Sequence, residues 1–74
     1  MPLVECAERV RADALVPGMY VEAKPRSWWR VVTRDEWCAP GSVLWVLSSP
    51  DGGTWAYWLV DAGQQVRVAR EEMD

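Results

Sequence analysis

One segment of the chain combines basic and aromatic residues at a spacing that suits nucleic-acid binding. Residues 24–34 contain four basic and no acidic residues, within a chain of formal net charge −3. In an extended strand, alternating residues share one face, and a guanidinium beside an exposed indole holds a phosphate while the ring stacks on a base. The alternative is that these arginines are solubilising charges, some of them paired with Glu22 or Asp35. The candidate residues are Trp28, Arg30 and Arg34 on one predicted face, with Lys24 and Arg26 at the adjoining turn.

Residues that catalyse reactions or bind metals are scarce. The chain has no histidine, and its two cysteines, Cys6 and Cys38, are too few for a zinc site. In a reducing compartment both are expected to be free thiols. Asp35 and Glu36 are adjacent, and neighbouring residues on a strand point to opposite faces, so they make a poor acid–base pair. We therefore predict that the protein is not an enzyme and holds no metal or cofactor.

Two apolar segments suggest a second candidate site, a protein interface. Residues 43–46 and 54–60 are apolar on both of their alternating faces. A small sheet has only one inside, so part of this surface must face outward, where Trp and Tyr are favoured interface anchors. An edge strand here could also pair with a second copy across a two-fold axis. In the alternative, residues 3–10 cover this face. The interface candidates are Trp45 (or Leu44, if that face of the strand points outward instead), Trp55, Tyr57 and Trp58.

Short alternating segments separated by Pro and Gly turns must position both sets of residues. The clearest turns are Pro17-Gly18 and the hairpin signal at 49–53. One domain is expected, with a core at about 8–69 and peripheral termini at 1–7 and 70–74. A buried indole removes roughly 150–250 Å² from water, so most of the six tryptophans are expected in the core. The expected strands are 8–12, 19–24, 28–34, 43–48, 54–60 and 65–69, with the last returning beside the first long one.

The order of these features resembles the small SH3-like, KOW-like barrel domain at the N-terminus of elongation factor P and related translation proteins. The resemblance covers about residues 12–69 and implies shape. The loop at 37–42 contains no lysine where that family has its functional lysine, so the translation role is not carried over. Similar stand-alone barrels are common among small proteins of bacteria and their phages. The residues that carry the resemblance are Asp13, Leu15, Pro17, Gly18, Trp29, Val31, Pro40 and Gly41.

The sequence thus predicts an all-β, SH3-like antiparallel barrel of five to six strands with little or no helix. We expect no signal peptide, because residues 1–5 show neither its basic nor its apolar region. No apolar run approaches the roughly 20 residues that span a bilayer. We expect a cytoplasmic, non-enzymatic interaction module that binds a protein partner or a second copy of itself. The alternative is a single-stranded nucleic-acid or ribonucleoprotein binder. No membrane association and no small-molecule substrate is implied.

Overall fold

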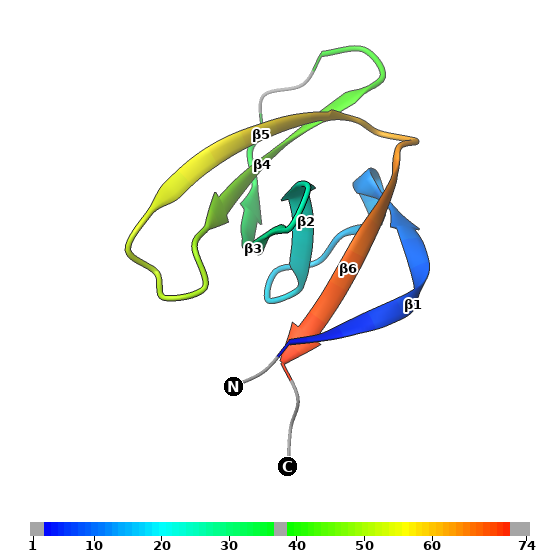
Figure 1. The fold of residues 1–74 in the computed structure, drawn as a ribbon. Coiled ribbons are helices and arrows are strands. Elements are labelled where there is room, and N and C mark those ends of the chain that lie inside the picture. Colours follow the sequence, from blue (N-terminus) through cyan, green and yellow to red (C-terminus); the bar gives the residue numbers. More distant parts are fainter. Residues whose placement is uncertain (1–2, 37–38, 72–74) are drawn as a thin grey trace.

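The computed structural model describes residues 3–36 and 39–71, with the backbone only for residues 5–8 and 71. This part of the chain forms one antiparallel sheet of six strands in the order β1-β6-β2-β3-β4-β5 (Figure 1). A single 3-10 turn, η1 (Ala12–Ala14), is its only helical element. The predicted all-β antiparallel fold with little or no helix is therefore confirmed. The strands are β1 (Leu3–Arg11), β2 (Tyr20–Lys24), β3 (Ser27–Arg34), β4 (Ser42–Ser48), β5 (Trp55–Asp61) and β6 (Gln65–Glu71).

The sheet curls around a core but does not close. Strand β6 pairs with β2, so the last strand returns beside the first long one as predicted, and it also pairs with β1, which leaves β1 and β5 as the two edges. In Figure 1, β5 arches across one side of the molecule while β1 and β6 run down the other. Strand β1 begins five residues before the expected strand, so residues 3–7 belong to the sheet. It also lies at the edge opposite to β5, and therefore leaves the outside of the β4–β5 hairpin uncovered.

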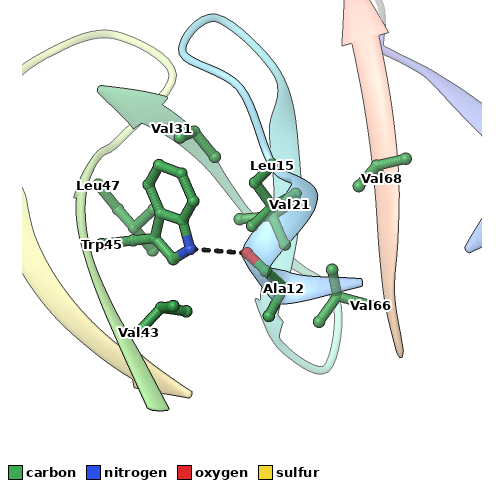
Figure 2. Close-up of a cluster of buried hydrophobic side chains, with 9 residues drawn as sticks. All are labelled: Ala12, Leu15, Val21, Val31, Val43, Trp45, Leu47, Val66 and Val68. Atoms are coloured by element: carbon green, nitrogen blue, oxygen red, sulfur yellow. Dashed lines mark hydrogen bonds between the residues drawn. The ribbon is translucent and has the colours of Figure 1, made fainter. Parts of the chain in front are cut away.

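Aliphatic side chains fill most of the core (Figure 2). Trp45 is the one buried tryptophan of the described residues, and its indole N–H donates to the Ala12 carbonyl over 2.9 Å. Trp29 and Trp58 only pack against the core. Trp37 lies outside the described residues, and of the five described tryptophans only Trp45 is buried, so the prediction that most of the six fill the core is wrong. The narrow interior of a small curled sheet suits compact β-branched side chains. The core residues are Ala12, Leu15, Val21, Val31, Val43, Trp45, Leu47, Val66 and Val68.

We call the side of the sheet that carries this core the inner face, and the opposite side the outer face. Residues directly opposite each other on paired strands lie on the same face. Their register therefore assigns each candidate residue to one face or the other.

Candidate interaction surface

The outer face of the β4–β5 hairpin carries a strip of exposed apolar side chains. Trp55, Tyr57 and Leu59 on β5 are 61%, 71% and 55% exposed, and Leu44 and Val46 on β4 are half-buried beside them. Contiguous apolar patches on small proteins commonly mark interaction sites. We call this set of five residues the apolar strip.

The regular pairing of β4 with β5 positions the strip. The register runs from Ser42 opposite Asp61 to Ser48 opposite Trp55 without a bulge. Tyr57 therefore lies beside Val46, and Leu59 beside Leu44. Next to them is a shallow depression of about 420 Å³, lined by Leu44, Tyr57 and Leu59 together with Asp35.

The turn between β4 and β5 is held by Asp51. Its carboxylate accepts hydrogen bonds from the Ser49 hydroxyl and from the Gly53 N–H. These bonds, the hydroxyl first, lower the pKa of Asp51 from its ordinary value of 3.8. Gly52 has a φ of 78°, a backbone conformation that residues with a side chain adopt only at an energetic cost. The predicted hairpin turn thus forms where the sequence indicated.

Strand β5 also presents unpaired backbone groups at the edge of the sheet. The Ser49 N–H donates to the Thr54 carbonyl over 2.8 Å, which makes that pair a hydrogen-bonded one. Hydrogen-bonded and non-hydrogen-bonded pairs alternate along an antiparallel ladder. The N–H and C=O groups of Trp55, Tyr57 and Leu59 therefore point away from β4, towards the open edge. The same three residues present apolar side chains and backbone hydrogen-bonding groups.

Two of the four predicted interface residues belong to this surface. Trp55 and Tyr57 face outward, whereas Trp45 is only 3% exposed and belongs to the core, so its assignment to the interface is corrected. The Ala12 carbonyl gives the Trp45 indole the hydrogen-bond partner that a buried indole needs. Trp58 lies opposite Trp45 on the inner face, half-buried against the core.

A bulge in β3 separates two of the predicted nucleic-acid residues. Arg30 lies opposite Ser48, but the register slips between Val31 and Thr33, so Arg34 lies opposite the inward-facing Trp45. Sequence alternation placed Arg30 and Arg34 on one face, and this is wrong because a bulge adds one residue to one strand.

Trp28 is already engaged by residues from two other strands. The guanidinium of Arg67 on β6 lies 5.9 Å from the centre of its ring, which is a cation–π distance. Arg67 also donates to both carboxylate oxygens of Glu22 at 3.2 Å. Glu22 lies opposite Trp28 on β2. The sequence did not single out Arg67, because 38 residues lie between it and Trp28 and no local pattern connects them.

Lys24 and Arg26 lie exposed at the ends of the turn between β2 and β3. Arg26 has a φ of 62°, in the left-handed region that non-glycine residues seldom adopt. Its N–H donates to the Glu22 carboxylate over 3.4 Å. The predicted basic set is therefore divided between a turn, the outer face and, for Arg34, the inner side of the sheet.

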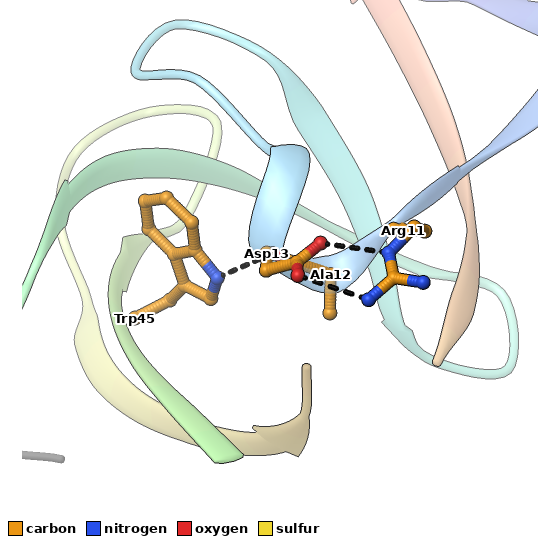
Figure 3. A network of polar contacts seen from close by, with 4 residues as sticks. All are labelled: Arg11, Ala12, Asp13 and Trp45. Carbon is orange, nitrogen blue, oxygen red and sulfur yellow. Dashed lines mark hydrogen bonds and ion pairs between the residues drawn. The ribbon is translucent and has the colours of Figure 1, made fainter. Parts of the chain in front are cut away.

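A polar contact at one end of the core has a structural role (Figure 3). Arg11 donates through Nε and Nη2 to the two Asp13 oxygens, at 3.1 Å each. This hydrogen bonding lowers the pKa of Asp13, and the positive charge of Arg11 lowers it further. Arg11 and Asp13 flank Ala12, whose carbonyl accepts a hydrogen bond from the Trp45 indole N–H. The backbone hydrogen bonds from the Ala12 and Asp13 N–H groups to the Gln64 and Ala62 carbonyls also hold η1 in place, whereas the Arg11–Asp13 pair is exposed to solvent.

Within residues 3–36 and 39–71, no group of three acidic or thiol side chains is placed to hold a metal ion. The same residues contain no helix that is long and apolar enough to cross a membrane. Cys38 and the side chain of Cys6 lie outside the described residues. That the protein is not an enzyme stays a prediction.

No family model, no curated protein and no solved structure matches this chain. The structure itself supports the coarse assignment, a small antiparallel all-β domain.

Proposed function

We propose that the chain is a protein-interaction module that binds through the apolar strip. The observation that carries this proposal is that Trp55, Tyr57 and Leu59 are more than half exposed on a regular hairpin at an open sheet edge. Tyr and Trp are among the residues that contribute most to binding energy at protein interfaces. Interfaces of this type need no catalytic group, which agrees with the prediction of a non-enzymatic protein.

The hairpin that carries the strip is preorganised for binding. Its inner face contributes Val43, Trp45 and Leu47 to the core, all nearly fully buried. The backbone below the strip is therefore fixed before a partner arrives. A preorganised surface loses less conformational entropy on binding, so more of the contact energy appears as affinity.

Single-stranded nucleic-acid or ribonucleoprotein binding remains the second candidate function. Arg67 adds a cation beside Trp28, and Arg9 lies opposite Arg67 on the neighbouring strand β1. Against this function, Glu22 places a carboxylate among these cations. Arg67 also covers the Trp28 ring on which a base would stack.

The finer fold assignment belongs to the same proposal. An SH3-like barrel resembling the N-terminal domain of elongation factor P is supported by the curled sheet, in which β6 returns between β1 and β2. A bacterial or bacteriophage source and a cytoplasmic location are proposed with it.

Site-specific photo-crosslinking in native cells tests the interaction function. A benzophenone amino acid replaces Tyr57 in the strip or, as the control, Val16, which is 54% exposed but lies outside the strip. We expect protein adducts, with this chain or another, to form from position 57 and far less from position 16. No adduct at 57, or equal adducts at both positions, would contradict the proposal.

A further inference from the structure

We propose that the partner of the apolar strip is a second copy of this chain. The two β5 edges pair antiparallel about a two-fold axis at Tyr57 and join two six-stranded sheets into one. This inference rests on the proposed function and names the occupant of the same surface.

Strand β5 lacks the features that normally prevent edge-to-edge pairing. Natural edge strands carry charged residues, proline or bulges that block a second strand. Residues 55–60 contain no charge and no proline, and β5 pairs with β4 without a bulge. The other edge, β1, contrasts with this, because its register is broken between Glu5 and Arg9. Of the two edges, β5 is the one open to pairing.

The alternation along β5 defines the register of such a pair. Outer-face side chains must stay on the outer face, so odd-numbered residues must oppose odd-numbered residues. With the axis at Tyr57, this residue meets Tyr57 of the second copy, and Trp55 meets Leu59 of the second copy. Both are apolar cross-strand pairs of the kind that stabilises sheets. The next register, centred on Trp58, would instead place Trp55 opposite the Asp61 carboxylate.

The backbone groups fit the same register. The N–H and C=O groups of Trp55, Tyr57 and Leu59 point to the open edge, so pairing forms hydrogen bonds at these three positions. A strand added at an edge gains affinity from such main-chain hydrogen bonds. A partner without an extended strand would leave these groups to water.

The available area suits a small dimer. Because Trp55, Tyr57 and Leu59 are 61%, 71% and 55% exposed, their side chains offer on the order of 400 Å² per chain. Pairing at the sheet edge covers the flanks of these side chains and the strand backbones of both copies but leaves the outward-facing tips exposed, so the interface lies at the small end of the size range, near or below about 1,200 Å². A two-fold axis lets the same edge of each copy pair with the other.

Charge-swap variants at Tyr57 test both the occupant and the register. On the two-fold axis, residue 57 lies opposite residue 57 of the second copy. Tyr57→Lys and Tyr57→Glu should therefore each weaken dimerisation by about tenfold or more, because like charges then oppose each other. An equimolar mixture of the two variants should form a heterodimer, because the opposite charges then attract. Sedimentation velocity and light scattering at low ionic strength measure it. Val16→Lys and Val16→Glu, at an exposed site outside the strip, should leave dimerisation unchanged.

Folding of both Tyr57 variants is checked by circular dichroism, and an exposed site should tolerate them. The proposal is overturned if the wild-type chain stays monomeric at about 1 mM, a concentration at which even weak association is populated. It is also overturned if the mixture associates no better than either variant alone. A monomer that still crosslinks another protein from position 57 would remove the dimer but keep the proposed function. A monomer with no adduct would remove both.

Discussion

The two halves of the outer face differ in how far their aromatic side chains are already used. On the β4–β5 hairpin, Trp55 and Tyr57 are exposed and carry no charged neighbour across the strand pair. On β2, β3 and β6, Trp28 is covered by Arg67, which Glu22 holds in turn. The number of aromatic residues in a segment therefore does not identify a binding surface. What identifies it is whether the fold has already supplied each ring with a partner.

The halves also differ in the regularity of their strands. The β4–β5 register is unbroken, whereas β2–β3 and β3–β4 each contain a shift. Period-two alternation therefore holds in the first half and fails in the second. The unbroken register keeps the apolar strip on one face, and the bulge in β3 divides the predicted basic face.

The largest effect should come from removing a tryptophan below the strip rather than on it. Trp45→Ala is expected to destabilise the fold by about 3–5 kcal/mol, because it empties the core and leaves the Ala12 carbonyl without its donor. Trp55→Ala, at a 61% exposed site, should change stability by less than about 0.5 kcal/mol. Urea unfolding of both variants measures the difference. Similar losses would mean that Trp55 also supports the fold.

A smaller effect should separate the two arginines of the basic half. If the second candidate function holds, Arg30→Glu should weaken oligonucleotide binding about tenfold at low salt. Arg34→Glu should change it by less than about twofold, because the β3 bulge places this residue on the other side of the sheet. Fluorescence anisotropy with a labelled single strand at two salt concentrations reports both. Equal losses would contradict the separation, and no binding by the wild-type chain would exclude the function.

The smallest effect should appear at the tip of the β4–β5 hairpin in acid. Hydrogen bonds from Ser49 and Gly53 lower the pKa of Asp51 below 3.8 in the folded chain. Its contribution to stability is therefore complete above this value and is lost as the pH falls through the folded-state pKa. Asp51→Asn should lower the Tm more at about pH 6 than at about pH 2.5. A pH-independent difference would show that the charge does not matter. Asp13→Asn is the matched comparison. The pKa of Asp13 is also lowered, by its contact with Arg11, so this variant should show the same pH dependence of its Tm loss.

Much of the fold follows from local signals in the sequence, and less of the site does. Turns at Pro17-Gly18 and at residues 49–53 were predicted where they form, because Gly and Asp at these positions specify the backbone directly. The orientation of β5 had a signal too, since Asp61 shares the face of Trp55 and Leu59 and a terminal charge favours the solvent side. The alternation of β5 alone leaves that orientation open. Val46 and Leu59 were missed as strip residues for the same reason.

Local patterns in the chain are enough to predict that short alternating segments pair as an antiparallel sheet, and the composition excludes histidine chemistry. The folded arrangement is needed to show which face of each apolar strand points outward, where β3 gains an extra residue and which cation lies over Trp28. The reason is that alternation is symmetric between the two faces of a strand. The register with neighbouring strands, and contacts between residues far apart in the chain, break this symmetry.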